Sequence, residues 1–207
     1  MASSSGIPVP YDAILIGSGD REQPFDTTIT NRFYMLKDEH LKTHRYTSPL
    51  VHGNLFDTTD NLIQQGTTAQ QAAAVVSLNN AKGWYIELGE GEKVDGPSTT
   101  LSGATFFGTN TPADPDSRVC IGNLGTARTY AVDYLTAGAV IHLDGNLGDP
   151  LNLDDRSIVI PGGGFPPAPV ALQVDVDGQP QQGVAFGPKI FQPAGQGFGR
   201  RYREWWY

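Results

Sequence analysis

Short apolar runs that end at glycine, proline or aspartate recur along the chain and predict β-strands. The run at residues 11–17 stops at Gly17-Ser18-Gly19-Asp20, as a buried strand does when it enters a turn. The pair Asp177-Gly178 favours a hairpin between the last two runs because both positions tolerate positive φ. The predicted strands are residues 11–17, 32–38, 83–88, 98–108, 127–135, 157–160, 170–176 and 184–186.

One segment has the features of a helix. Residues 68–78 are rich in alanine and glutamine, and Thr67 precedes them as a candidate N-cap. We therefore expect one short helix near residues 67–80, after a polar, irregular stretch over residues 39–66. No helix alternates with the predicted strands, so the pattern favours an all-β, mainly antiparallel fold and leaves a sandwich and a propeller equally open.

Composition agrees with many short elements joined by tight turns. The 207 residues include 25 glycines and 15 prolines, which disfavours a helical bundle. The net charge of −8 opposes nucleic acid or an anionic bilayer as the main partner, because both would repel the chain. The sequence shows no apolar run of the roughly 18 residues that cross a membrane and no export signal at its start. Residues 1–10 resemble a flexible leader or a remnant of recombinant expression, and we expect residues 11–207 to belong to one domain, cut from a longer protein.

Candidate catalytic motifs are weak. Residues 17–20 lack the lysine of a phosphate-binding loop and the third glycine of a dinucleotide site, so we interpret them as a strand-ending turn in which Asp20 and Arg21 bond nearby groups. Arg21 and Glu22 would then brace adjacent loops. No Gly-x-Ser-x-Gly elbow occurs. The single cysteine, Cys120, excludes a disulfide within the chain and a cysteine-based zinc cluster.

Other ionisable residues predict surface positions and no site. The four histidines, His40, His44, His52 and His142, are expected in solvent-exposed loops, because no glutamate lies between the first two in a zinc-binding pattern. The acidic pairs Asp154-Asp155 and Glu90 with Glu92 are expected to be solvated. We therefore predict no catalytic, cofactor-binding or metal-binding residue in this segment.

The C-terminal residues 198–207 combine arginines with aromatic side chains. Such a segment can stack on bases or sugars, but the negative net charge favours docking of its aromatic rings onto the body of the protein.

Several motifs occur in the same order as in one known family. The chain resembles the C-terminal β-propeller of PilY-type proteins, which are type IV pilus tip-associated adhesins and biogenesis factors. The similarity extends from about residue 12 to the end and covers only the closing part of such a propeller. The matching segments are residues 13–24, 31–38, 82–88, 91–94 and 106–112, Cys120 with residues 128–133, the Gly-Pro run 162–169 and the arginine- and tryptophan-bearing end.

This resemblance implies a non-catalytic protein of the bacterial cell surface, exported and associated with the outer membrane at the pilus tip. It would act in pilus assembly, twitching motility and adhesion by binding. The implied partners are minor pilins or other pilus components, a host-surface ligand, and upstream propeller blades. Loops on one propeller face would present a polar surface, while buried aromatics hold the blades: Trp84, Tyr85, Phe106 and Tyr130.

The family's calcium loop is not visible in this segment, although calcium remains possible in the full-length family domain. The nearest candidate, residues 144–149, is rejected as that site. It has Gly148 at the fifth position, where an oxygen ligand is needed, and Asp149 at the sixth, where the sharp turn needs glycine. Two other functions remain open. A quinoprotein-like enzyme shares the propeller architecture, and a carbohydrate-binding module would use Trp205 and Trp206.

Overall fold

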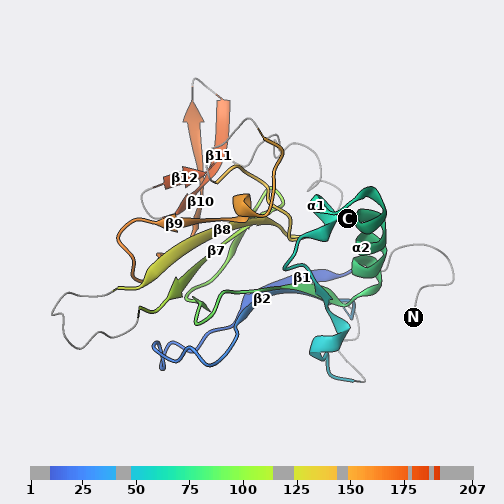
Figure 1. The fold of residues 1–207 in the computed structure, drawn as a ribbon. Coiled ribbons are helices and arrows are strands. Elements are labelled where there is room, and N and C mark those ends of the chain that lie inside the picture. Colours follow the sequence, from blue (N-terminus) through green and yellow to red (C-terminus); the bar gives the residue numbers. More distant parts are fainter. Residues whose placement is uncertain are drawn as a thin grey trace.

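The computed structural model describes residues 10–40, 48–113, 124–143, 149–176, 179–186 and 189–191. These residues form a mostly β-structure of three sheets stacked as layers, with the first sheet lowest and the third uppermost in Figure 1. All strand pairs are antiparallel except β3 with β4. The predicted all-β, mainly antiparallel class is therefore confirmed for the described part of the chain.

The first sheet has the order β1-β2-β4-β3. Its strands are β1 (Asp12–Gly17), β2 (Arg32–Asp38), β3 (Phe56–Asp57) and β4 (Gly83–Glu87). Every second side chain of β2 is buried, beginning with Phe33 and Met35, so this face points into the protein. On β1 the opposite face leaves Ile14 and Ile16 about half exposed.

The strands of the second sheet lie side by side in the order in which they follow along the chain, as in a meander. The third sheet has fewer strands. The second contains β5 (Lys93–Val94), β7 (Ala104–Thr111), β8 (Thr126–Asp133) and β9 (Ser157–Ile160), and β6 (Thr99–Leu101) also pairs with β7. The third contains β10 (Val170–Val176), β11 (Gln179–Phe186) and β12 (Lys189–Phe191).

The second sheet is covered on both faces, which explains why nearly every residue of β7 is buried. Toward the first sheet, the ring of Phe107 stacks parallel to that of Phe33 with centroids 3.8 Å apart, and Tyr130 stacks on its other side at 4.7 Å. Toward the third sheet, Phe106 lies 6.1 Å from Phe191. Since neighbouring residues of a strand point to opposite faces, Phe106 and Phe107 join two separate cores.

Helix α2 (Thr68–Asn80) packs beside the sheets, on the right in Figure 1. Thr67 caps its first turn through a capping box with Gln70, as the sequence predicts. At its other end, the buried Lys37 amine of β2 donates hydrogen bonds to the carbonyl oxygens of Leu78 at 3.0 Å and Ala81 at 2.9 Å. Burial lowers the pKa of Lys37, while the carbonyl groups satisfy its donors.

Several boundaries differ from the predictions. The predicted strand 98–108 is a hairpin, β6 and β7, that turns at Ser102-Gly103. The stretch 39–66, expected to be irregular, contains β3, the short helix α1 (Leu62–Gln65) and a 3₁₀ turn at His52–Asn54. The predicted strand 127–135 ends earlier, at Asp133. The pairing of Val176 with Gln179 confirms the hairpin across 177–178, although the two turn residues lie outside the described set.

No helix in the described ranges is long and apolar enough to cross a membrane.

Candidate binding site at the loop end

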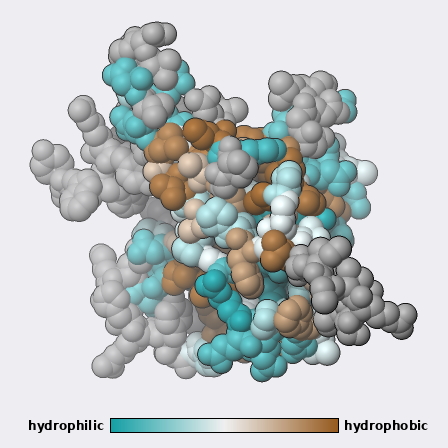
Figure 2. Space-filling view, turned by 90° about the vertical axis from the view of Figure 1, so that its left-hand side faces the viewer, coloured by the Kyte–Doolittle hydropathy of each residue, from teal (hydrophilic) through white to brown (hydrophobic). Residues whose placement is uncertain are grey.

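Loops from all three sheets meet at one end of the stack. They are residues 18–31 between β1 and β2, residues 88–92 before β5, the parts of the β7–β8 connection next to those strands, and residues 161–169 after β9. This end lies on the left of Figure 1 and faces the viewer in Figure 2, where apolar side chains gather across its upper half among hydrophilic ones. We refer to it as the loop end.

Four large apolar side chains are exposed on the loop end. Phe25 is 63% exposed, Ile29 57%, Leu124 61% and Phe165 54%. Large apolar side chains that remain exposed on adjacent loops are a feature of interaction surfaces. The observed surface of these loops is therefore more apolar than the polar loop surface that the sequence predicted.

A surface pocket of about 240 Å³ opens in the loop end. It is lined by residues of the 18–31 loop and by the start of β5, namely Gly19, Asp20, Asp26, Ile29, Asn31 and Lys93. The Lys93 amine donates a hydrogen bond to the carbonyl oxygen of Asp26, and the Asp20 carboxylate accepts one from the backbone N–H of Glu22 at 2.8 Å. The pocket thus carries charges of both signs on a loop held in a defined shape.

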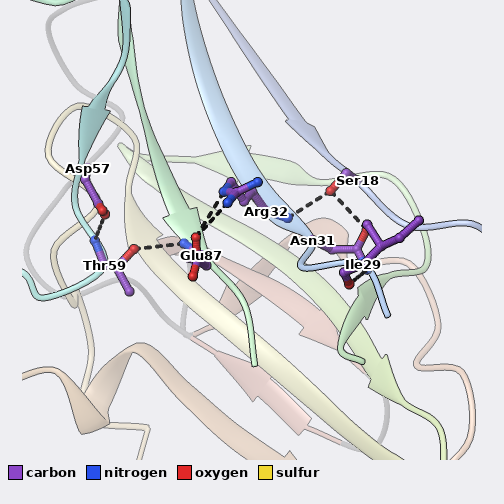
Figure 3. A network of polar contacts seen from close by, with 7 residues as sticks. All are labelled: Ser18, Ile29, Asn31, Arg32, Asp57, Thr59 and Glu87. Atoms are coloured by element: carbon purple, nitrogen blue, oxygen red, sulfur yellow. Dashed lines mark hydrogen bonds and ion pairs between the residues drawn. The ribbon is translucent and has the colours of Figure 1, made fainter. Parts of the chain in front are cut away.

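Ser18 lies next to two residues that line this pocket, Gly19 and Asp20, and ties the surrounding strands together. Ser18 Oγ accepts a hydrogen bond from the backbone N–H of Arg32 at 2.8 Å and donates to Asn31 at 3.3 Å (Figure 3). The backbone N–H of Val94 donates to the Ser18 carbonyl oxygen, which ties the first sheet to the second. No helix follows Gly17, so the interpretation of residues 17–20 as a strand-ending turn is confirmed, and Asp20 bonds nearby backbone as predicted.

The loop around Arg21 contacts the loop after β9. The Arg21 guanidinium carbon lies 5.6 Å from the centre of the Phe165 ring, within the range of a cation–π contact. The contact links the two loops, but Arg21 is itself exposed and is not an internal strut. Glu22 is exposed, and its backbone N–H donates to the Asp20 carboxylate.

Figure 3 also shows the outer face of the first sheet next to this motif. Arg32 of β2 forms a half-exposed ion pair with Glu87 of β4 at 2.8 Å. The Glu87 N–H donates to Thr59 Oγ1, and the Thr59 N–H donates to Asp57. The chain of contacts holds the loop after β3 against the sheet.

A buried carboxylate, Glu92, is the centre of the support under the loop end. It is only 4% exposed and accepts hydrogen bonds from the Gly89 N–H at 2.9 Å, from the Thr109 hydroxyl and from the Tyr130 hydroxyl at 3.0 Å. Asn31 donates to its backbone carbonyl oxygen at 3.0 Å. Burial and the neighbouring Glu92 charge raise the pKa of Tyr130, which therefore remains a hydrogen-bond donor.

The loop that carries Glu92 approaches the 18–31 loop closely. At Gly91, φ is +67°, and a Cβ atom there would lie 2.6 Å from Thr27 Cγ2. Both the backbone conformation and the space therefore favour glycine at this position. The prediction that Glu90 and Glu92 are solvated is right for Glu90 and wrong for Glu92, because three donors compensate its burial.

The other connections at the loop end are held by Asn110 of β7. Its side-chain amide donates to the carbonyl oxygens of Leu124 at 3.2 Å and Gly164 at 2.6 Å. The Gly164 N–H in turn donates to Leu124 at 2.9 Å. The exposed Leu124 and Phe165 are therefore presented on backbone that a buried side chain restrains.

A second buried carboxylate, Asp95, lies next to this support and has no such partners. It is 5% exposed, and neither of its carboxylate oxygens has a hydrogen-bond partner. Burial raises its pKa to about 7, although the charges of Arg21 and Lys93 oppose the increase. The charge of Asp95 therefore changes with pH near neutrality.

Two buried charged residues, Asp155 and Arg156, lie away from the loop end, directly before β9 of the second sheet. Arg156 connects this sheet to the residues that follow β3 of the first sheet. Asp155 is fully buried, accepts the Asn152 N–H at 2.9 Å, and lies 3.4 Å from His142 Nδ1. Arg156 donates to the carbonyl oxygens of Thr58 and Thr59 at 2.8 and 3.0 Å, and burial lowers its pKa to about 10.

These contacts overturn two further predictions. Asp155 is not solvated, although Asp154 is exposed, and His142 is partly buried, with its Nδ1 3.4 Å from the Asp155 carboxylate, rather than solvent-exposed. His52 is exposed as expected and His40 is half-buried. Among the predicted buried aromatics, Trp84 and Phe106 are fully buried and Tyr130 is half-buried, whereas Tyr85 lies half-exposed on the outer face of the first sheet.

Some predicted features lie outside the described residues, namely His44, Cys120, residues 144–148 of the rejected calcium loop and the C-terminal segment 198–207. Within the described ranges, no group of three or more His, Cys, Asp or Glu side chains is arranged to hold a metal ion. The exposed apolar set at the loop end was not predicted from the sequence. Its signal was present, since large apolar residues at 25, 29, 124 and 165 stand in connections rich in glycine, proline and aspartate.

Comparison with known proteins found no family model, no curated protein and no solved structure that matches this chain.

Proposed function

We propose that this chain is a non-catalytic, pilus tip-associated protein of the PilY type that acts by binding through its loop end. The order of the sequence motifs supports the pilus assignment. The observation that carries the binding role is the exposed set Phe25, Ile29, Leu124 and Phe165, which the buried Glu92 and Asn110 side chains support from below. A restrained apolar surface of this kind loses little conformational entropy when a partner binds.

The stack of sheets supports the proposal that residues 11–207 are the closing part of a β-propeller. Propeller blades are small antiparallel sheets that pack face to face around an axis. The second sheet has a neighbour on each face, while the first sheet leaves Ile14 and Ile16 half exposed on its outer face. An upstream blade would cover this face in the longer protein.

The proposed partners are minor pilins or other pilus components at the cell surface, with a host-surface ligand as the second possibility. Apolar loop residues with mixed charges around them suit a protein partner, because protein interfaces combine an apolar centre with a polar rim. Export, the outer-membrane association and any calcium site elsewhere in the domain are parts of the same proposal.

Binding to purified minor pilins from the same genome, measured by biolayer interferometry, tests this function. We expect Phe25→Ser and Phe165→Ser each to weaken binding by roughly 10-fold or more, as the loss of a buried aromatic at an interface does. Val76→Ser is the matched control, because Val76 is also exposed, at 60%, but lies on α2 away from the loop end.

Two results would contradict the proposal. One is the absence of binding to any minor pilin by the unmodified protein. The other is equal loss of binding by the loop variants and the α2 control, which would show that the loop end has no special part in recognition.

A further inference from the structure

The exposed carboxylates of the loop end lie together in one part of it. Among the described loop residues of this end, four carboxylates are exposed or half-buried, and all of them belong to residues 18–31 and 88–92. These two loops approach each other closely, since a Cβ atom at Gly91 would lie 2.6 Å from Thr27 Cγ2. We call them the acidic part of the loop end. Its exposed or half-buried carboxylates are those of Asp20, Glu22, Asp26 and Glu90.

The positive charges near the acidic part are already engaged within the chain. Lys93 lines the pocket but is only 5% exposed, and its amine donates a hydrogen bond to the Asp26 carbonyl oxygen. Arg21 is exposed, and its guanidinium lies against the Phe165 ring. Because Arg21 is the one exposed cation among the described residues of these loops, the acidic part has a negative potential.

Two of the carboxylates line the pocket of about 240 Å³. Thr28 donates to Asp26 Oδ1 through its hydroxyl at 2.6 Å and its backbone N–H at 2.9 Å, and these bonds lower the pKa of Asp26. Asp20 Oδ1 is held by the Glu22 N–H. The exposed Ile29 adds an apolar wall to the same pocket. Oriented carboxylates beside an apolar wall suit a lysine or arginine side chain, which has a charged end on an apolar stem.

The rest of the loop end is apolar. Residues 161–169 contain no charged side chain and carry the exposed Phe165. Leu124 is exposed beside them, because the Gly164 N–H donates to its carbonyl oxygen. Apolar side chains gather in the upper half of this face in Figure 2. A partner that covers the whole loop end must therefore match an apolar part and an acidic part at the same time.

We propose that the partner of the loop end is a protein surface with lysine or arginine side chains beside an apolar patch, and that one basic side chain enters the pocket lined by Asp20 and Asp26. This inference rests on the binding role proposed above and specifies the chemistry of the partner. The apolar part supplies contact area, and the acidic part orients the partner and speeds its approach.

Titration of the intact chain with two synthetic peptides, followed by NMR of its backbone amides, tests this chemistry without a pilin. The peptides share the same phenylalanine and leucine residues, and one has lysine wherever the other has glutamate. We expect the lysine peptide to shift the amides of Gly19, Ile29 and Asn31 and to bind at least roughly 10-fold more tightly than the glutamate peptide. Equal binding of the two peptides, or no shift of these amides by the lysine peptide, would overturn the inference.

Uncharged variants separate the effect of charge from that of shape. Asp20→Asn/Asp26→Asn removes two charges and keeps the side-chain oxygens that accept the loop hydrogen bonds. It should weaken binding of the lysine peptide at least roughly 5-fold at about 20 mM salt and less than about twofold at about 500 mM, because salt screens exposed charges. Asp12→Asn/Asp154→Asn is the matched control, since it changes the net charge equally at exposed positions away from the loop end. Equal weakening by the two double variants would also overturn the inference.

The minor-pilin assay distinguishes failure of this inference from failure of the proposed function. If no minor pilin binds, the proposed function fails, and the two peptides still decide the chemistry of the surface. If pilins bind and Asp20→Asn/Asp26→Asn does not slow their association at low salt, the inference fails and the binding role stands. Phe165→Ser should weaken pilin binding at both salt concentrations, because salt does not screen the burial of apolar surface.

Discussion

Replacement of Asp95 by asparagine should change how the stability of the protein depends on pH. Asp95 is 5% exposed, its carboxylate oxygens lack hydrogen-bond partners, and burial raises its pKa to about 7. The folded protein therefore binds a proton at Asp95 more tightly than the unfolded chain does. As a result, the contribution of this group to the free energy of unfolding is complete below about pH 4 and is lost as the pH rises to about 7.

The size of this loss follows from the two pKa values. Between the ordinary value of 3.8 and about 7, at roughly 1.4 kcal/mol for each pKa unit, the cost reaches about 4 kcal/mol above neutrality. Asp95→Asn keeps the shape of the side chain and removes the charge. The variant should therefore be more stable than the unmodified protein by up to about 4 kcal/mol at pH 8, and by only about 1 kcal/mol at pH 4.5, where the unfolded chain has already begun to ionise.

Urea unfolding at several pH values between 4.5 and 8, followed by circular dichroism, measures this difference. Other titrating groups are common to both proteins, so their contributions cancel when the two free energies of unfolding are subtracted. Asp154→Asn is the control, because Asp154 is exposed in the same chain. A difference between Asp95→Asn and the unmodified protein that stays constant from pH 4.5 to 8 would refute the reasoning.

Three further substitutions test the packing, each by urea unfolding. Phe107→Ala removes the ring stacked 3.8 Å from Phe33 between two sheets and should cost about 3–5 kcal/mol; a loss below about 1 kcal/mol would mean that the sheets do not depend on this contact. Thr67→Ala removes the N-cap of α2 and should cost about 1 kcal/mol, whereas Thr67→Ser should be nearly neutral. Gly83→Ala places a Cβ 1.9 Å from the Met35 carbonyl oxygen at φ +142° and should cost at least about 3 kcal/mol; normal stability would contradict the described geometry.

At the loop end, buried polar side chains hold the loops in place, and exposed apolar side chains form the surface. Buried polar groups, above all Glu92 and Asn110, satisfy backbone and hydroxyl partners and hold the loops in place. Exposed apolar groups such as Phe25 and Phe165 make no such contribution to the core and are available for a partner. In the function proposed above, a partner would meet loops that are already held in place by a rigid scaffold.

Local patterns determined much of the secondary structure. The apolar, aromatic run of β2, the Thr67 capping box and the Asp177-Gly178 hairpin signal each depend on residues within a few positions of one another, so they are visible in the sequence. Where the prediction was wrong, local signals were weak. The two residues of β3 form a strand only because β4, far along the chain, offers a parallel edge.

Tertiary structure alone decided the stacking of the sheets and the state of the charged residues. Glu92 has the appearance of a solvated turn residue in the sequence, but its partners Asn31 and Tyr130 lie 61 and 38 positions away. Arg156 is likewise buried because its carbonyl partners, on Thr58 and Thr59, lie 98 and 97 positions away. The sequence determines which residues can form a strand, a turn or an ion pair. Only the packing of distant segments determines which charges leave water, because the cost of burial is offset by partners that the chain brings together when it folds.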